Sequence, residues 1–422
     1  MKNSYHIYWK HKYTKIRNYL FLFLKWILIA TSAGITGGII GSIFSLALSH
    51  ATSFRESHSV IIYFLPLGGL FIVFIYKITK MSEIGINNII ESIRTSEKVP
   101  YILIPVIFIA TLITHLLGGS AGREGAALQL GGSIGYNIGR GFRLDKKDLH
   151  IAVQCGMSAV FASLFGTPVT AAIFALEVIS VGIIHGSAIL PCLLAAVISS
   201  KAALMAGIAP ECFPLDSIYA LNHTNFIRTS VTAAVCAVVS IIFCGSMHRS
   251  EHIFKKYLPN PYIRIFCGGS IIIILTMLLN TYDYNGAGMH VIERAFDGEC
   301  VPYAFLLKII FTAVTIGCGF KGGEIVPTFF IGATLGAALG HIFGADAGFY
   351  AAVGLISMFC GVLNCPLASI ILSIELFGSE SLVLFALAVG ISYILSGYYG
   401  LYSSQKIIYS KLKSKYININ TK

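Results

Sequence analysis

The sequence predicts an all-α protein that crosses a membrane many times, and its composition is the first reason. Of the 422 residues, 56% are hydrophobic and only 12% are charged, and the mean hydropathy is +0.78. Soluble domains carry roughly 25% charged residues, so this chain has too few polar groups to cover a water-exposed body. The 42 glycines lie within apolar runs rather than in polar repeats, which excludes a fibrous or disordered chain.

The second reason is the number of apolar segments, which leaves room for roughly ten to seventeen helices. Many segments are shorter than the about 20 residues that span a bilayer, and glycine clusters join them instead of polar loops. Such interrupted segments are typical of broken and re-entrant helices around a mid-membrane site. The segments are 19–49, 59–78, 101–118, 125–139, 150–166, 168–185, 187–207, 228–246, 263–280, 303–319, 325–343, 348–364, 367–378 and 382–398.

The third reason is an internal repeat, because three blocks recur in the same order about 200 residues apart. Chance similarity between apolar segments is the alternative, but the shared order and spacing favour a true repeat. Repeated halves with interrupted helices are typical of transporters and channels. The paired blocks are Asn88–Glu91 with His290–Glu293, Gly122–Gly132 with Gly323–Ala333, and Gly156–Pro168 with Gly354–Pro366.

These observations predict two membrane repeats, a loop between them, and a basic segment at each end. Lys and Arg number 30 against 19 Asp and Glu, and by the positive-inside rule the basic ends face the cytoplasm. We therefore expect a multi-pass protein of the cell inner membrane with both termini cytoplasmic. The boundaries are 1–18 (basic segment), 19–207 (first repeat), 208–227 (loop), 228–405 (second repeat) and 406–422 (basic tail).

The net positive charge has nucleic-acid binding as its alternative interpretation. We expect no nucleic-acid partner, because the chain has no soluble domain that could present a basic patch. The ten cysteines form no CxxC pair, so we expect neither a disulfide framework nor a metal site. We also expect no cofactor.

The densest chemical signal is the glycine-rich turn of Gly118–Gln129, which opens a helix at about Gly125. Unpaired N–H groups and the positive end of the helix dipole make such a turn an anion site. Glu124 stands where an anion would bind. It is therefore expected to act as a titratable surrogate anion, which blocks the site when ionised and leaves when protonated. The alternative is a helix-capping carboxylate paired with Arg123.

The same turn carries a family resemblance. GREGAALQLGGSIG and GTPVTAAIFALEV resemble blocks of the CLC family of chloride channels and anion/proton antiporters. The segments Thr114–Gly125 and Gly319–Ala333 are similar to the fluoride/proton antiporter branch, and the resemblance covers about residues 20–405. It implies a CLC-type fold of two inverted-topology repeats, and a homodimer with one independent pathway in each subunit.

The resemblance also implies roles for two glutamates. Glu124 matches the gating glutamate that exchanges with the anion and carries protons. Most CLC antiporters have a second proton glutamate one residue after the position of Glu177, where this chain has Val178. This departure argues against the ordinary chloride/proton mechanism and suits either a channel or the fluoride branch.

Glu324 matches an additional acid of the fluoride branch that is implicated in proton coupling. It lies in the block Gly323-Glu-Ile-Val-Pro327, where most of the family has GxFxP. Its alternative role is an ion pair with Lys321. The branch commonly has threonine where Val326 stands, which puts a hydroxyl-mediated fluoride transfer in doubt. Gly323, Ile325 and Val326 are expected along the anion pathway, with Arg123 and Gly125 at the equivalent place in the first repeat.

Other candidates come from the same comparison of blocks. In the family, the first-half anion loop carries a serine, and here Glu83–Ile90 replaces that loop. Asn87 or Asn88 takes the place of the serine, and an amide can donate to a small hard anion. The alternative is a turn or cap asparagine. Tyr402 matches the tyrosine that lines the inner end of the pathway, with an interfacial anchor as its alternative. Ring edges of Phe329 and Phe330 could face fluoride, with helix packing as the alternative.

Four further polar residues are expected to be structural. They are His115 and His290, which should make local hydrogen bonds, and Glu177 and Glu375, which lie at equivalent positions near helix ends.

The function expected from these residues is a secondary antiporter that exports fluoride as protons enter the bacterial cytoplasm. The expected partners are fluoride or chloride ions, protons, the lipid bilayer and a second copy of the chain. A chloride/proton antiporter or passive chloride channel is the alternative. A distant alternative is an intramembrane enzyme that uses Glu124 and Glu324 as an acid pair, but paired Asp motifs, HExxH and GxSxG are absent from the sequence, so we expect no enzyme.

Overall fold

The computed structural model describes residues 2–81, 84–95, 97–215 and 219–422, with side chains described from residue 12 onwards. Met1, Glu83 and residues 216–218 of the expected inter-repeat loop therefore lie outside the described residues. The first half forms α1 (Lys2–Ser57), η1 (Ser59–Phe64, a 3-10 helix), α2 (Leu65–Ile78), α3 (Ile86–Thr95), α4 (Leu103–Leu116), α5 (Glu124–Gly141), α6 (Lys146–Phe165), α7 (Pro168–Glu177) and α8 (Gly186–Met205).

The second half repeats this order of helices. It forms α9 (His223–Tyr257), α10 (Pro261–Leu279), α11 (Met289–Phe296), α12 (Ala304–Gly317), α13 (Ile325–Ile342), α14 (Ala347–Leu363), α15 (Pro366–Phe377) and α16 (Leu382–Leu395). The equivalent helices α5 and α13 both have 18 residues, and α4 and α12 both have 14. Each half thus contributes eight α-helices within the described residues.

The expected interruptions of the helices occur at equivalent places in the two halves. α6 ends at the left-handed Gly166, and α7 begins two residues later at Pro168. α14 ends at the left-handed Asn364, and α15 begins at Pro366. A proline in the first turn starts a helix without leaving an unpaired N–H, so each pair is one path broken by a sharp turn.

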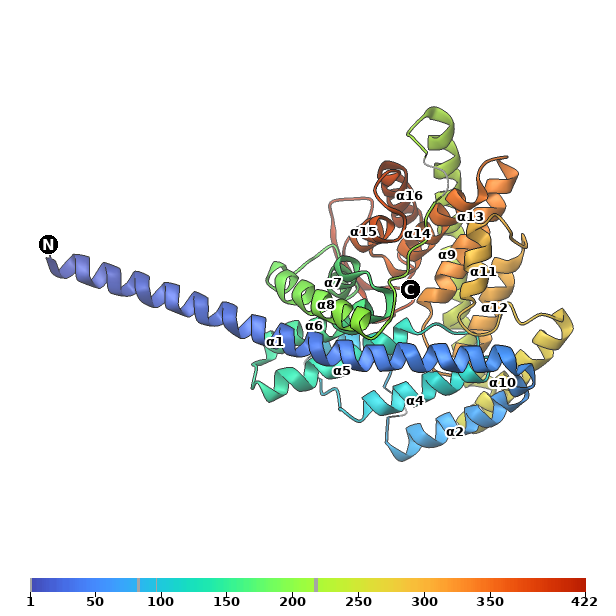
Figure 1. The fold of residues 1–422 in the computed structure, drawn as a ribbon, viewed down its shortest axis with the longest axis horizontal. Helices are drawn as coiled ribbons and strands as arrows, with labels where there is room; N and C mark the ends of the chain where they lie inside the picture. The colour runs from blue at the N-terminus through green and yellow to red at the C-terminus, as the bar shows by residue number, and fades with distance from the viewer. Residues whose placement is uncertain (1, 82–83, 96, 216–218) are drawn as a thin grey trace.

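The most closely packed helices are the equivalent pairs α5–α6 and α13–α14, and every residue of α14 is buried. α2 and α10 lie at the edge of the molecule (Figure 1) and expose apolar side chains. Within the described residues, seven helices are long and apolar enough to cross a membrane: residues 12–57, 59–78, 146–165, 186–205, 223–257, 261–279 and 325–342.

Both ends of the chain contain regular secondary structure. The first residues continue directly into α1, which extends away from the body at its N-terminal end (Figure 1). The tail forms β2 (Lys406–Tyr409) and β3 (Tyr416–Asn420), which pair antiparallel, while β2 also pairs in parallel with β1 (Ser180–Val181). This three-stranded sheet holds the tail against the first half and is an element that the sequence analysis did not predict.

Candidate functional site

The two glycine-rich turns meet at the start of α5 and α13. Gly122 N–H donates to the Gly323 carbonyl oxygen at 2.6 Å, and Gly323 N–H donates to the Gly122 carbonyl oxygen at 2.7 Å. This reciprocal pair joins equivalent residues of the two repeats. It brings together two helix N-termini, and therefore two sets of unpaired backbone amides, inside the protein.

Glu124 is the first residue of α5, and its side chain is completely buried. Its Oε2 accepts a hydrogen bond from the Val326 N–H at 3.1 Å, in the first turn of α13. Its Oε1 has no hydrogen-bond partner within the described residues. The carboxylate therefore occupies an anion position at a helix N-terminus, but the helix belongs to the other repeat rather than to Glu124 itself.

Arg123 is engaged mainly by groups other than Glu124. Its guanidinium forms an ion pair with Glu211, donates to the Leu164 carbonyl oxygen at 3.2 Å, and lies 5.4 Å from the centre of the Phe165 ring. The Arg123 Nε is 4.0 Å from the Glu124 Oε1. The Arg123 guanidinium is thus close enough to act electrostatically on the Glu124 carboxylate, while the ion pair with Glu211 holds the guanidinium in place. Sequence reasoning did not single out Glu211, which is one of the acids in the loop between the repeats.

Glu324 occupies the residue just before α13 and reaches toward the start of α5. Its Oε2 is buried and has no hydrogen-bond partner within the described residues. A Cβ built on Gly125 would lie 3.4 Å from this oxygen. The alternative ion pair with Lys321 is wrong for this structure, because the Lys321 Nζ lies 4.6 Å from the centre of the Tyr76 ring and forms no ion pair with Glu324 among the described residues.

A cavity of about 640 Å³ adjoins the helix crossing, and we call it the vestibule. It is lined by four of the residues that the sequence predicted for the pathway, namely Asn87, Asn88, Glu324 and Tyr402. Gln129, one turn along α5, lines it as well, and its buried Oε1 has no hydrogen-bond partner within the described residues. Sequence reasoning missed Gln129, although its position four residues after Gly125 places it on the face of α5 that points inward.

The two asparagines have different roles. The Asn87 Oδ1 accepts hydrogen bonds from the Ser404 N–H at 3.2 Å and from the Ser404 hydroxyl at 3.0 Å, which ties α3 to the loop that carries Tyr402. The Asn88 Oδ1 accepts from the Gly85 N–H, three residues earlier, at 2.9 Å, as a side chain in the first turn of a helix does when it caps that helix. This contact agrees with the alternative role of Asn88 as a turn or cap asparagine.

Tyr402 is 2% exposed, and its hydroxyl has no hydrogen-bond partner within the described residues. An interfacial anchor would keep its hydroxyl in the headgroup region, so that alternative is wrong. A buried tyrosine hydroxyl that lines a cavity is instead available to donate to an anion.

The two phenylalanines pack as ordinary core residues. Phe329 lies against Phe165 and Phe359, with ring centres 6.1 and 5.5 Å away. Phe330 lies 6.2 Å from the Tyr284 ring, and the Lys308 Nζ lies 5.0 Å from the Phe330 ring centre. Neither phenylalanine is among the residues that line the vestibule.

Lys308 is a completely buried cation that sequence reasoning missed. Its Nζ donates to the carbonyl oxygens of Tyr284 at 3.2 Å and Gly286 at 2.8 Å. Arg55 is also buried and donates to the His115 carbonyl oxygen at 3.1 Å. The two cations are about 250 residues apart in the chain, so only the folded structure reveals that they flank the same loop, residues 284–286.

The four residues expected to be structural behave as predicted. The His115 Nδ1 lies 3.0 Å from the Thr111 carbonyl oxygen, and the His290 Nε2 lies 3.1 Å from the Asp283 Oδ1. The two acids cap helices of opposite repeats. Glu177 accepts from the N–H groups of Leu367 and Ala368 at 3.2 and 2.9 Å, and Glu375 accepts from those of Val169 and Thr170 at 3.0 and 2.8 Å.

Two repeats of broken helices around opposed helix N-termini define a polytopic membrane transport protein with an anion site. Residues 68–397 match the family described as voltage gated chloride channel. The chain is 34% identical to the chloride/fluoride channel protein of Pseudomonas syringae pv. tomato over 92% of this chain and 87% of that protein. It therefore belongs to the CLC family of chloride channels and transporters.

Solved structures agree with this assignment. The crystal structure of a CLC-type fluoride/proton antiporter, 34% identical, superimposes with a TM-score of 0.88 over 91% of this chain and 98% of its own. A slow cyanobacterial chloride/proton antiporter, 18% identical, shares the fold with a TM-score of 0.75 over 88% of this chain and 94% of its own. The predicted CLC-type fold is confirmed.

Proposed function

We propose that this chain is a secondary antiporter that exports fluoride in exchange for protons. The observation that carries the proposal is the hydrogen bond from the Val326 N–H to the buried Glu124 carboxylate. An ionised carboxylate accepts from the Val326 N–H as an anion would, and a protonated one binds this amide weakly. Protonation of Glu124 thus releases the amide to a transported anion, and departure of the anion returns it to the carboxylate.

Glu324 supplies the second acid of this cycle. Its unpartnered Oε2 lies beside Gly125, and its side chain lines the vestibule. A proton leaving Glu124 toward the vestibule therefore has an acceptor close by. Val178 stands where most CLC antiporters have their second proton glutamate, so this chain needs an acid elsewhere, and Glu324 meets that need.

Fluoride is the preferred substrate in this proposal because of the relatives. The solved structure that matches at 34% identity is titled a fluoride/proton antiporter, and the Pseudomonas relative's name includes fluoride. Chloride is the second candidate, since that relative's name also includes chloride and channel. Val326 favours this second candidate, because it lacks the hydroxyl that the fluoride branch commonly has there.

We further propose a homodimer in the cell inner membrane, with residues 19–207 and 228–405 as its two repeats. The basic residues of the two ends and of the loops near 140–147 and 249–264 support cytoplasmic termini. The vestibule, which Arg264 and Lys255 also line, then opens to the cytoplasm.

The proposal is tested by an efflux assay with liposomes that contain the purified protein and are loaded with potassium fluoride. With valinomycin to balance charge, we expect the external fluoride concentration and the external pH to rise together, because protons move inward as fluoride leaves. A passive channel would release fluoride without the pH change. Chloride release that matches fluoride release would favour the second candidate.

Glu124→Gln is the variant that tests the carboxylate mechanism. The amide keeps the size of the side chain but cannot exchange a proton, so we expect anion movement to continue without the accompanying rise in external pH. Glu380→Gln, at an exposed residue, is the matched control that should leave both signals unchanged. Intact proton coupling in Glu124→Gln would refute the proposed role.

A further inference from the structure

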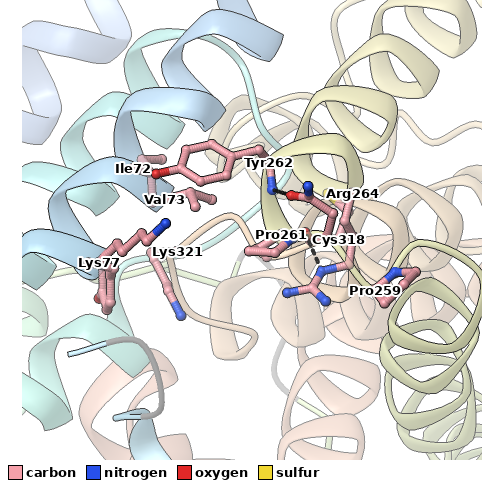
Figure 2. A pocket seen from close by; sticks show the side chains of 12 residues that line it. Ile72, Val73, Lys77, Pro259, Pro261, Tyr262, Arg264, Cys318 and Lys321 are labelled. Atoms are coloured by element: carbon pink, nitrogen blue, oxygen red, sulfur yellow. Dashed lines mark hydrogen bonds between the residues drawn. The ribbon is translucent and has the colours of Figure 1, made fainter. Parts of the chain in front are cut away.

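A second cavity of about 620 Å³ lies between α2 and α10 (Figure 2), and Glu124 is not among its lining residues. It is lined by the last two turns of α2, from Ile72 to Lys77, by residues 259–264 at the start of α10, and by Cys318, Gly319 and Lys321. We call it the peripheral cavity. None of the acids in the described residues lines it.

The way in which α2 and α10 pack explains where the cavity forms. A Cβ on Gly69 would lie 2.9 Å from the Ile265 Cγ1, and one on Gly269 would lie 3.0 Å from the Pro66 nitrogen. The helices therefore run antiparallel and approach closely at these glycines. The cavity opens beyond this crossing, where the last turns of α2 and the proline-rich start of α10 no longer fill the space between them.

The surroundings of the cavity are those of a lipid-facing surface. α2 and α10 form the edge of the molecule (Figure 1). Phe71, Phe74, Ile263 and Phe266, on the same turns of these helices, are 45–52% exposed. Apolar side chains exposed on a membrane helix contact acyl chains, so the mouth of the cavity is open to lipid.

Three cations converge on the cavity. The Lys77 Nζ lies 5.7 Å from the Tyr262 ring centre, the Lys321 Nζ lies 4.6 Å from the Tyr76 ring centre, and the Arg264 Nε donates to the Cys318 carbonyl oxygen at 3.4 Å. Figure 2 shows the three side chains around the same space. None of the three forms an ion pair with another residue that the structure describes.

We propose that the peripheral cavity binds the headgroup of an anionic phospholipid. The phosphate would be held by Lys77, Arg264 and Lys321, with the acyl chains along the apolar outer faces of α2 and α10. Basic pockets between membrane helices on the cytoplasmic side bind anionic headgroups, and tyrosine rings are common at this depth. A zwitterionic headgroup fits less well, because its choline would meet three cations that form no ion pair within the described residues.

Arg264 and Lys321 also line the vestibule. A bound phosphate would therefore share two cations with the entrance of the proposed anion pathway, and a lipid there lies next to the vestibule that contains Glu324. The lipid site itself does not depend on which ion the protein transports.

The test is native mass spectrometry of the delipidated full-length protein in neutral detergent, titrated with dioleoyl-phosphatidylglycerol. We expect a saturable bound lipid, and we expect the double variant Lys77→Gln/Lys321→Gln to bind it at least about tenfold more weakly, since each cation contributes to headgroup binding. The matched control is Lys146→Gln/Lys147→Gln, which removes the same charge from exposed residues at the start of α6 and should keep wild-type affinity.

Three results would overturn the proposal. They are equal affinity in both double variants, equal affinity of the wild type for dioleoyl-phosphatidylcholine, and binding of free glycerol phosphate as tight as that of phosphatidylglycerol. The exposed single variant Lys77→Gln, checked by its thermal midpoint, replaces the double variant if the latter does not fold. No ion is transported in this experiment, so its outcome is independent of the proposed antiport.

Discussion

Two acids of opposite repeats share one crossing but differ in their partners. Glu124 reaches across to an amide of α13, whereas Glu324 ends in an oxygen without a hydrogen-bond partner within the described residues. By the repeat alignment Glu124 corresponds to Ile325, so the two acids are not symmetry mates. The second repeat carries its acid one residue earlier, before the helix begins, and this offset directs the Glu324 side chain to the vestibule.

Tyr402→Phe tests the role of the unpartnered hydroxyl. Because this hydroxyl makes no hydrogen bond within the described residues, its removal should leave the thermal midpoint unchanged. Loss of a hydrogen bond to a charged group corresponds to about tenfold weaker anion binding, which we expect to observe as slower fluoride efflux at low fluoride concentration.

Tyr398→Phe is the matched control for this prediction. The Tyr398 hydroxyl lies 2.9 Å from the Ser410 Oγ, outside the vestibule. Its removal should cost about 1 kcal/mol of stability and leave efflux unchanged. Wild-type efflux in Tyr402→Phe would show that the hydroxyl does not contact the anion.

At the scale of elements, the breaks between α6 and α7 and between α14 and α15 depend on acids supplied by the other repeat. The Glu177 carboxylate is almost fully buried, whereas Glu375 is half-buried. Each carboxylate accepts hydrogen bonds from two backbone N–H groups at the start of a short helix. Such charge-assisted caps also stabilise the helix dipole.

Glu177→Gln and Glu375→Gln should both destabilise the protein. An amide side chain accepts with one oxygen only, so one of the two N–H groups loses its partner, at a cost of about 1–2 kcal/mol. We expect the larger fall in thermal midpoint for Glu177→Gln, because its site is more buried. The exposed Glu380→Gln serves as the control, and equal midpoints for all three variants would contradict the capping role.

The α5–α6 contact predicts a strong effect of one added methyl group. A Cβ on Gly156 would lie 2.1 Å from the Gly131 carbonyl oxygen, and its equivalent on Gly354 would lie 2.1 Å from that of Gly332. Gly156→Ala should therefore force the helices apart and cost about 1–3 kcal/mol. Because α5 carries Glu124, efflux should fall too.

Gly390→Ala is the matched control in this experiment. A Cβ at that position in α16 meets no atom within 4 Å, and alanine is the better helix former. Its thermal midpoint should be equal to or higher than that of the wild type. A similar loss in both alanine variants would show that close packing is not the cause.

The sequence predicted the elements that depend on local pattern and repetition. The repeat predicted the equivalence of Gly122 and Gly323, and the glycine-rich turns predicted the helix starts within one residue. The capping partner of Glu124 could not be predicted, because a repeat alignment does not say which helix a side chain faces. Glu211, Lys308 and the strands of the tail were missed for a similar reason: each is an unremarkable residue or segment whose partner is distant in the chain.

At the scale of the whole molecule, equivalent residues of the two halves complete each other. The Gly122–Gly323 pair, the two acid caps and the α2–α10 crossing are all contacts between the halves. Their cores are also joined directly, since α13 contacts α5 and α15 contacts α7. Neither half alone therefore has a satisfied set of helix N-termini.

A split protein tests this dependence. Residues 1–207 and 208–422, expressed separately, should each be degraded or aggregate, because buried N–H groups at α7 or α15 would lack their acid. Expressed together, they should assemble and restore fluoride efflux. Recovery of either half alone as a monodisperse, thermally cooperative protein would contradict the prediction.

The exchange of caps between α7 and α15 also has a consequence for biosynthesis. Translation proceeds from the N-terminus, so α7 leaves the ribosome long before Glu375 has been made. The first repeat must therefore wait in the membrane with the start of α7 unsatisfied until about 200 further residues have been inserted. During that interval, water, lipid headgroups or the insertion machinery must accept hydrogen bonds from the two N–H groups that later donate to Glu375.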